Sequence, residues 1–411
     1  MPTTRGWAAF AAGLFLWVAS RFMGSPDLHM VAVGLVALPF LAVAFVRWRR
    51  VSVDAHRNLS LARVYPRTRV TVSLRVENRS RVTLPFLLLQ DAVPPTLGKP
   101  ARLVITGIPP RNAQTVSYSI VCRHRGRYSL GPLTVYFADP FGLARVPMTS
   151  PTTTELVVYP EVEAIEPWRL GIQGAGSGES AARHLHRSAA EFYTMREYVT
   201  GDDLRRIHWP SVARTGRLMI RQDEATRRSA ATLFLDNRSG TLGANGSPAF
   251  ERAVSITASL GRMLMASGFA VRLAMVDGPA RPIAEEGMLD VLASTSPVRT
   301  KGLGEALTLL RATSRPDSGL ALVAAIPQPP ELAAMLRAGS PFGKKLAVFV
   351  YSHDPSALRP ESAAEIETRA SAARLSLVRA GWEVYLVKPD GRLNDVWQPR
   401  RPRLQVAGLP S

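Results

Sequence analysis

The chain has 411 residues, of which 46% are hydrophobic and 20% charged, with one cysteine and a net charge of +19. This composition excludes a disordered or collagen-like chain, a disulfide framework and a multi-cysteine metal site, and the length suits two or three domains. The positive charge is spread along the chain: +4 in 1–50, +7 in 51–165, +3 in 166–228 and +5 in 229–411. Proteins that bind nucleic acid usually carry their basic residues clustered on one face. Because the charge here is dispersed, no nucleic-acid partner is expected.

Two apolar runs begin the chain. The first extends from Trp7 to Met23 and the second from Leu28 to Val46, with a short polar turn between them. A membrane-spanning helix needs roughly 17–25 apolar residues, so residues 1–50 are predicted to form a transmembrane helical hairpin in contact with the lipid bilayer. A signal peptide is a single apolar stretch that ends at a cleavage site, which the second run argues against. A buried hairpin in a soluble protein is the alternative interpretation.

Arginines at the ends of the hairpin predict its orientation. Arg47, Arg49 and Arg50 follow the second run, and such basic flanks stay on the cytoplasmic side. Both termini and the bulk of the chain are therefore expected in the cytoplasm. Arg21 lies toward the outer side and opposes this rule mildly, although its long side chain can reach the interface.

Residues 51–165 contain short runs that alternate between polar and apolar side chains. Turn residues separate the runs, which is typical of strands. The predicted strands are Val70–Val76, Leu84–Leu89, Ala101–Ile105, Thr115–Cys122, Leu133–Phe137 and Thr154–Tyr159. Several short strands without helices between them indicate a small β-sandwich or barrel, with a binding or spacer role as the simplest expectation.

Residues 166–228 are predicted to be a linker followed by a segment dense in charged and aromatic residues. The candidate interaction residues of this segment are Tyr198, Gly201, Asp202, Arg205, Arg206, His208, Trp209, Arg214, Gly216 and Arg221. One interpretation is a salt-bridged docking surface. The other is a hydrolase-like site, in which His208 is a general base near Ser211, oriented by Asp202 or Asp203. No Gly-x-Ser-x-Gly turn surrounds Ser211, so docking is favoured and no catalytic residue is assigned.

Strands and helices alternate in residues 229–390. Strands are expected at Ala230–Asp236, Phe269–Val276, Leu320–Ile326, Lys345–Tyr351 and Trp382–Val387. Helices are expected at Pro248–Ser267, Glu285–Ser294, Leu303–Ala312, Glu331–Ala338 and Glu361–Arg379. This alternation predicts a mostly parallel sheet covered on both faces, followed by a Pro/Arg-rich tail at 391–411. Since the first strand is not followed by Gly-x-Gly-x-x-Gly, a nicotinamide enzyme is not expected.

Several motifs resemble those of a bacterial family named domain of unknown function 58. They are Arg123–Leu133, Asp139–Leu143, Val158–Pro160 and, most specifically, Tyr198–Trp209 with Ala213–Arg221. The resemblance implies a protein of the bacterial cell membrane with two N-terminal spans and a von Willebrand factor A-like C-terminal domain. It also implies partnership with a MoxR-type AAA+ ATPase in the assembly or maturation of envelope or secreted components.

The resemblance further implies a divalent-cation site, which this sequence fits poorly. In von Willebrand factor A-like domains the first strand ends in Asp-x-Ser-x-Ser, whereas here Asp236 is followed by Asn237, Arg238, Ser239 and Gly240. Lys301 lies near the family's threonine position. Two positive charges oppose a cation that needs hard oxygen ligands, so the site at Asp236, Arg238 and Lys301 is predicted to be degenerate and free of metal.

The expected fold is therefore α+β and multidomain: a two-helix transmembrane hairpin, a small β-sandwich and a C-terminal α/β von Willebrand factor A-like (Rossmann-like) domain. The expected function is that of a membrane-anchored, cytoplasm-facing scaffold without cofactor or enzymatic activity. Two alternatives stay open: a hydrolase-like enzyme that uses Asp202, His208 and Ser211, and an anionic-lipid-binding protein that uses the arginines after the second span.

Overall fold

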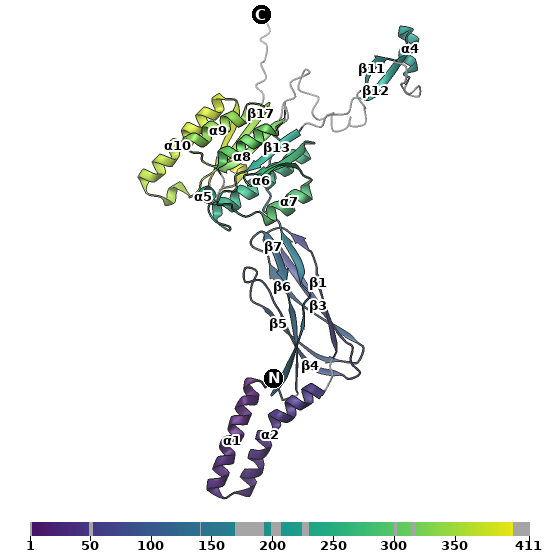
Figure 1. Cartoon of the computed structure of the whole chain (residues 1–411), viewed down its shortest axis with the longest axis vertical. Helices are drawn as coiled ribbons and strands as arrows, with labels where there is room; N and C mark the ends of the chain where they lie inside the picture. Colours follow the sequence, from purple (N-terminus) through teal and green to yellow (C-terminus); the bar gives the residue numbers. More distant parts are fainter. Residues whose placement is uncertain are drawn as a thin grey trace, which may run out of the picture. The chain divides into compact units, whose positions relative to one another are not determined.

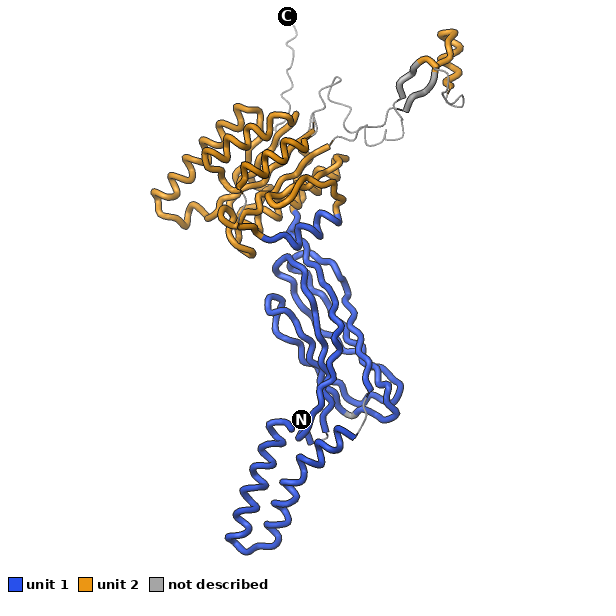
Figure 2. Tube along the Cα trace, in the orientation of Figure 1, with its two compact units in different colours: residues 1–162, 286–296 blue, residues 163–285, 297–411 orange. Residues whose placement is uncertain are grey.

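The structure is a computed structural model that describes residues 2–48, 52–139, 141–168, 193–198, 207–223, 230–299, 302–314 and 318–397. The chain divides into two compact units, one of residues 1–162 and 286–296 and the other of residues 163–285 and 297–411 (Figure 2). The first unit contains a helical hairpin and antiparallel sheets, and the second contains a six-stranded mixed sheet with helices (Figure 1).

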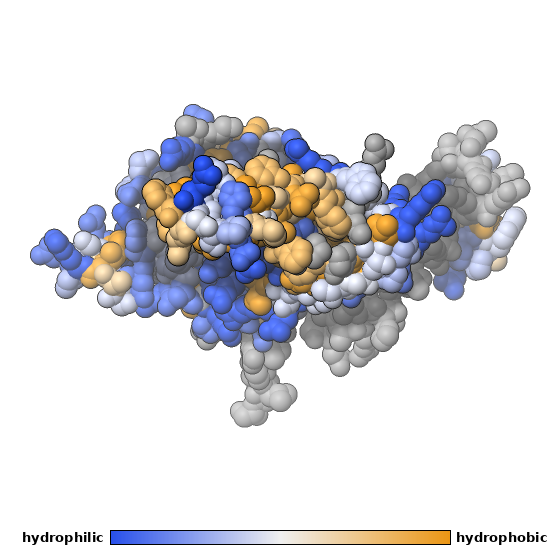
Figure 3. All heavy atoms as spheres, turned by 90° about the horizontal axis from the view of Figure 1, so that it is seen from below, coloured by the Kyte–Doolittle hydropathy of each residue, from blue (hydrophilic) through white to orange (hydrophobic). Residues whose placement is uncertain are grey.

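Helices α1 (Thr4–Met23) and α2 (Pro26–Trp48) form the hairpin that the two apolar runs predict. The helices approach closely at Gly13, where an added Cβ would lie 2.8 Å from the backbone nitrogen of Val36. Small residues at such contacts are typical of helices that pack in a membrane. Both helices are long and apolar enough to cross a bilayer, and apolar side chains gather on the hairpin surface in the view of Figure 3.

The described part of the first unit also contains ten strands. They are β1 (Val53–Leu59), β2 (Arg63–Val64), β3 (Arg69–Asn78), β4 (Leu84–Asp91), β5 (Ala101–Ile108), β6 (Ala113–Val121), β7 (Gly126–Leu130), β8 (Leu133–Ala138), β9 (Arg145–Ser150) and β10 (Thr154–Val158). Their sheets have the orders β1-β3-β6, β2-β10-β7 and β5-β4-β8-β9. All neighbouring strands are antiparallel except the short β2–β10 pair. The six strands predicted from alternation are all present, and β1, β2, β7 and β9 are additional.

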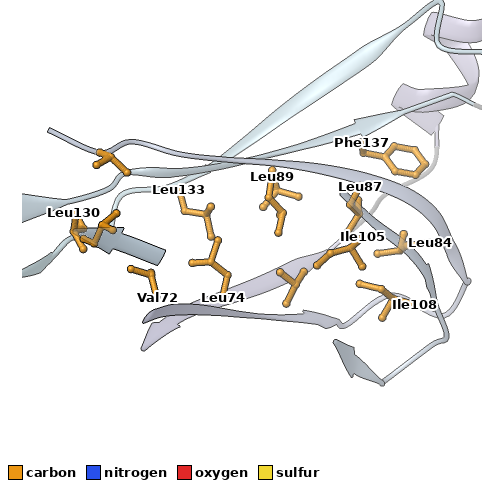
Figure 4. Packing of buried hydrophobic residues seen from close by; sticks show 14 of the residues in the cluster. Val72, Leu74, Leu84, Leu87, Leu89, Ile105, Ile108, Leu130, Leu133 and Phe137 are labelled. Carbon is orange, nitrogen blue, oxygen red and sulfur yellow. The ribbon is translucent and has the colours of Figure 1, made fainter. Parts of the chain in front are cut away.

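The sheets of the first unit share one hydrophobic core. Alternate residues of β3 are fully buried, and they meet leucines, isoleucines and Phe137 from β4, β5 and β8 (Figure 4). Successive side chains of a strand point to opposite faces, so the alternation in sequence marks one face of each sheet as the inner one. The prediction of an all-β module after the hairpin is confirmed.

Helix α7 (Glu285–Ser294) is joined to this first unit although it lies far along the chain. Arg125 donates hydrogen bonds to the carbonyl oxygens of Leu292 at 2.7 Å and Thr295 at 2.9 Å. These carbonyls lie at the C-terminal end of the helix, where the helix dipole favours a positive charge. Arg125 therefore caps α7 from outside its own sequence neighbourhood.

The second unit is built on one six-stranded sheet. Its strands are β13 (Ala230–Leu235), β14 (Ala270–Met275), β15 (Gly278–Pro282), β16 (Gly319–Ala325), β17 (Lys344–Val350) and β18 (Trp382–Val387). The order is β15-β14-β13-β16-β17-β18, with β14–β15 as the antiparallel pair and the others parallel. The five predicted strands are confirmed and β15 is additional. In this doubly wound order the switch point, where ligands bind in such sheets, lies between β13 and β16.

Helices accompany this sheet as the alternation predicts. They are α5 (Ser239–Leu242), α6 (Pro248–Ala266), α8 (Leu303–Ala312), α9 (Pro329–Gly339), α10 (Pro360–Arg379) and α11 (Leu393–Val396), with a 3-10 turn at Pro355–Ala357. All seven residues of β16 are buried, so the sheet is covered on both faces there. Residues expected in the tail take part in the packing: Leu393 is buried, and the Trp397 ring stacks on Tyr385 with 4.9 Å between centroids.

Candidate functional site

The charged and aromatic segment forms a hairpin with a short helix between its strands. Strand β11 (Tyr193–Glu197) pairs with β12 (Met219–Asp223), and α4 (Trp209–Thr215) lies between them in sequence. The backbone nitrogen of Tyr198 donates to the carbonyl oxygen of Leu218 at 2.8 Å, and that of His208 donates to Met219 at 2.9 Å. Residues from both halves of the motif are thus joined to the start of β12.

His208 and Ser211 are in contact at the start of α4. Nδ1 of His208 lies 2.9 Å from Oγ of Ser211, and the Ser211 nitrogen donates to the His208 carbonyl oxygen at 2.9 Å. A histidine beside a hydroxyl is one element of a nucleophilic site. The two residues are one helical turn apart, so local helix geometry is sufficient to bring them together. Asp202, the third group of the hydrolase interpretation, lies outside the described residues.

The helix α4 presents an aromatic side chain to solvent. Trp209 is 66% exposed, and Arg214 is also exposed in the last turn. Gly216 ends the helix with φ +68°, and its nitrogen donates to the Val212 carbonyl oxygen at 2.8 Å, which explains a glycine at this point of the motif. Arg217 pairs with Glu197 at 2.6 Å across the hairpin.

The other candidate residues of the motif are described in part or not at all. Arg221 lies in β12 opposite Met195 of β11. Gly201, Asp202, Arg205 and Arg206 lie outside the described residues, as do Arg49, Arg50 and Lys301. Arg47 lies in the last turn of α2. The structure therefore brings together Tyr198, His208 and Ser211 through the hairpin and the first turn of α4.

A second candidate site lies at the carboxyl end of β13, next to the switch point of the sheet. Asp236 is fully buried, and its nitrogen donates to the Val323 carbonyl oxygen of β16 at 2.8 Å. The Arg238 guanidinium binds both oxygens of the Asp236 carboxylate: Nε lies 2.8 Å from Oδ1 and a terminal nitrogen 2.8 Å from Oδ2. The other terminal nitrogen lies 2.5 Å from Oε1 of Glu331. A bidentate arginine–carboxylate pair with a third bond is a strong and directional arrangement.

Glu331 completes this cluster from the start of α9. Its Oε2 accepts a hydrogen bond from the Gln328 nitrogen at 2.8 Å, so the same carboxylate caps α9 and binds Arg238. Burial disfavours the charged guanidinium, but the hydrogen bonds and charges of Asp236 and Glu331 outweigh it and raise the pKa of Arg238 above its usual value. Arg238 therefore stays protonated between the two carboxylates.

Arg238 occupies the oxygen atoms that a divalent cation at Asp236 would need. Ser239, the other candidate ligand in this loop, donates instead from Oγ to the Val298 carbonyl oxygen at 3.2 Å. Among the described residues, no group of three or more His, Cys, Asp or Glu side chains has the spacing of a metal site. The guanidinium supplies the positive charge that the buried carboxylate requires.

The neighbouring Asn237 ties the cluster to β14. Its side chain is buried, with Oδ1 accepting from the Val276 nitrogen at 3.1 Å and Nδ2 donating to Asp277 at 3.3 Å. Its carbonyl oxygen accepts from Val298 at 2.8 Å. The loop after β13 is thus held by the ends of two neighbouring strands and by the segment before α8, and its conformation is strongly constrained.

One family profile matches both the segment of β11, α4 and β12 and most of the six-stranded sheet. Residues 194–360 match the sequence profile described as "Protein of unknown function DUF58". The chain is also similar to the uncharacterized protein YeaD of Bacillus subtilis (strain 168), with 25% identity over 233 residues that cover 55% of this chain and 56% of the relative. The match therefore spans little more than half the length of that relative.

Solved structures give weaker similarities. The CARDB domain of a Pyrococcus furiosus protein in complex with di-metal ions is 11% identical over 26% of this chain and 93% of that chain, with a TM-score of 0.21. The alkylpurine DNA glycosylase AlkC of Pseudomonas fluorescens is 14% identical over 34% of this chain and 42% of that chain, with a TM-score of 0.18. TM-scores of this size do not indicate a shared fold.

Proposed function

We propose that this chain, whose residues 194–360 match the DUF58 family of proteins of unknown function, is a membrane-anchored, cytoplasm-facing scaffold that binds a MoxR-type AAA+ ATPase. In this proposal α1 and α2 anchor the chain, and the second unit carries the binding surface. A von Willebrand factor A-like, Rossmann-like character of that unit belongs to the proposal and is supported by the doubly wound strand order. The client would be an envelope or secreted component.

The observation that carries the proposal is the exposed Trp209 within the family region. Tryptophan and arginine are the residues most enriched among those that dominate binding energy at protein interfaces. Trp209 and Arg214 lie on one short helix, and Arg217 follows it directly. A tryptophan that is this exposed and lies near two arginines is better explained by contact with a protein partner than by packing within its own helix.

The Arg238 cluster supports a binding role for the loops at the carboxyl ends of the central strands. A loop held by a buried ion pair and by backbone bonds to neighbouring strands keeps one conformation, and a surface ordered in advance loses less entropy when a partner binds. The hydrolase alternative rests on one contact between residues a single helical turn apart, and we do not include it in the proposal.

Orientation of the anchor follows from its basic flank. Arg47, with Arg49 and Arg50 after it, is proposed to keep the end of α2 in the cytoplasm. Replacement of all three by Gln is expected to give a mixture of orientations, measured with topology reporters fused to the C-terminus. A single unchanged orientation would contradict the assigned role of these arginines.

Binding is tested with the purified full chain in detergent and the purified MoxR-type ATPase of the same organism, with Mg²⁺ and with or without ATP. We expect a nucleotide-dependent Kd that the Trp209→Ala variant weakens by about tenfold or more, as is usual for an interface hot spot. Leu375→Ala, at an exposed position of α10, is the matched control and should bind as the unchanged chain does. Equal affinity of the Trp209→Ala variant, or no binding in either nucleotide state, would contradict the proposal.

A further inference from the structure

The length of α1 determines where the adjoining part of the first unit lies, provided that the proposed anchoring holds. Twenty residues of α-helix extend over about 30 Å, which equals the thickness of the hydrocarbon core of a bilayer. Nearly all of α1 is therefore needed to cross the membrane. The first residue of the helix must lie at the cytoplasmic edge of the hydrocarbon region.

The turn between β8 and β9 is attached to that same end of α1. The Thr3 nitrogen donates to the Leu143 carbonyl oxygen at 2.8 Å, and Thr3 Oγ1 donates to that of Gly142 at 2.7 Å. The contact is so close at Gly6 that a Cβ there would collide with the Leu143 carbonyl oxygen. The turn therefore lies at the same depth as the start of α1, at the membrane surface.

The turn is ordered by its own hydrogen bonds and carries an exposed aromatic side chain. The buried Asp139 carboxylate accepts from the nitrogens of Phe141 at 3.0 Å and Ala144 at 2.5 Å. Phe141, between these two, is 70% exposed. An ordered turn that presents a phenyl ring at the level of the lipid headgroups is suited to insertion into the membrane interface.

A groove of about 250 Å³ lies between this turn and α2. Its lining consists of Leu38, Leu41, Ala42, Phe45, Asp139 and Phe141. The surface is apolar, because the Asp139 carboxylate accepts hydrogen bonds from the backbone of the turn. Leu38, Leu41 and Phe45 lie at helical spacing on one face of α2, and this face continues along the membrane-spanning part of the helix.

We propose that this groove binds an acyl chain of a phospholipid from the cytoplasmic leaflet, with the Phe141 ring inserted beside it. The proposal rests on the membrane anchoring proposed above. Arg5, whose guanidinium lies 3.9 Å from the Cβ position at Gly142, is beside the turn, and Arg47 lies in the last turn of α2, so both are placed at the level of the headgroup phosphate. Trp7 and Trp48, both exposed, lie near the same ends of the two helices, as expected for an aromatic belt at the interface.

The test uses the full chain in phosphatidylcholine vesicles that contain a lipid with a photoreactive diazirine on its acyl chain. Crosslinked residues are mapped by mass spectrometry after illumination. We expect crosslinks in the groove, at Leu41 and Phe141, in addition to those on the outer hairpin surface near Phe22 and Met30, both of which are exposed. Phe141→Asp is expected to lower the yield in the groove at least fivefold and to leave the yield near Phe22 unchanged.

The matched control is Phe86→Asp, which changes another exposed phenylalanine of the β-rich part. It should leave all crosslinks as they are. Crosslinks near Phe22 and Met30 without any in the groove would overturn the lipid site and leave the anchoring intact. No crosslinks at either place would overturn the anchoring itself. Because the map of the unchanged chain already separates these outcomes, the test does not depend on the folding of a variant.

Discussion

Each unit contains a buried aspartate bound by an arginine, and the two pairs are built differently. In the first unit Arg57 of β1 binds Asp91 of β4, and their side chains are 3% and 0% exposed. In the second unit Arg238 binds Asp236 within one loop, and the arginine is 14% exposed. The first pair joins two different sheets, whereas the second closes a loop at the edge of a single sheet.

The surroundings of the two pairs also differ, because the first pair is more enclosed than the second. Around Asp91, Tyr118 donates from its hydroxyl at 2.6 Å, and Arg57 also donates to the Leu130 carbonyl oxygen at 2.9 Å, so the pair is enclosed by the core. Around Asp236 the third partner is Glu331, which is 19% exposed. A buried charge must be paired in either place, but only the second pair lies where solvent ions and partners have access. The first is therefore structural, and the second is partly exposed and is the one that the proposed function assigns to a binding surface.

The largest effect is expected from loss of the enclosed arginine. Arg57→Ala should lower the free energy of unfolding of the first unit by about 3–5 kcal/mol, because Asp91 would be left buried without its cation. Hydrogen exchange of β1 and β4 in the full chain measures this loss. Arg79→Ala removes an exposed partner of Asp54 and should cost under about 1 kcal/mol. Equal effects of the two substitutions would contradict the structural role of Arg57.

A smaller loss of stability is expected when Arg238, in the loop after β13, is replaced, and Mg²⁺ is expected to restore part of it. Arg238→Ala should cost about 2–3 kcal/mol, because Asp236 and Glu331 then face each other without the guanidinium. Loss of the guanidinium leaves the space beside these oxygens open to Mg²⁺, which at about tenfold above its Kd should restore about 1.4 kcal/mol. Thermal unfolding of the second unit with and without Mg²⁺ measures this.

The Arg57→Ala variant serves as the control for the rescue. Its Asp91 is enclosed, so Mg²⁺ should leave its stability unchanged. A rescue of both variants, or of neither, would remove the distinction between the enclosed pair and the accessible one.

Glu331→Gln should have a still smaller effect. The amide oxygen can still accept from the Gln328 nitrogen, so the cap of α9 is retained, and only the charged bond to Arg238 is lost. We expect a loss of about 1 kcal/mol in the unfolding free energy of the second unit. A loss as large as that of Arg238→Ala would mean that Glu331, and not Asp236, is the main partner of the arginine.

The smallest expected effect is the pH dependence of stability that is linked to two tyrosines, one in each unit. Burial, then the charge and hydrogen bond of Glu367, raise the pKa of Tyr351 to about 12. Burial, then the hydrogen bond to Asp91, raise the pKa of Tyr118 further still. Since the folded pKa exceeds the unfolded value near 10, the stability linked to Tyr351 is present below pH 10 and is lost as the pH rises through 12. The free energy of unfolding, measured across this pH range, should fall less in Tyr351→Phe than in the unchanged chain. Tyrosinate absorbance should show that Tyr351 ionises at a lower pH than Tyr118.

The elements that alternation and apolar length predict are those with a buried face. β3 alternates because its inner side chains fill the core, and β16 is apolar throughout because helices cover both of its faces. The strands that were not predicted, β1, β2, β7, β9, β11, β12 and β15, are all edge strands of their sheets. An edge strand is partly exposed and often polar on both faces, so its sequence carries little periodic signal.

Prediction of the sites was less complete. Arg238 was expected to oppose a cation at Asp236, because both residues belong to one short motif, and the structure shows its guanidinium bound to both Asp236 oxygens. Glu331 was not anticipated, since it lies 93 positions further along the chain and is brought to Arg238 by α9. The Arg57–Asp91 pair was missed for the same reason, because 34 residues separate its partners. Of the motif residues, Trp209 and His208 were chosen from the sequence, and their exposure and contacts come from the fold.

The sequence alone determined the helical hairpin, the all-β segment, the alternating α/β segment and the resemblance of residues 194–360 to the DUF58 family. These follow from periodicity, apolar length and short motifs, which are properties of neighbouring residues. The tertiary structure decided the strand order, the attachment of the β8–β9 turn to α1, and the partners of each buried charge. Such pairings join residues that are distant in the chain, and they are selected by the free energy of burying charge and apolar surface together, which no short stretch of sequence contains.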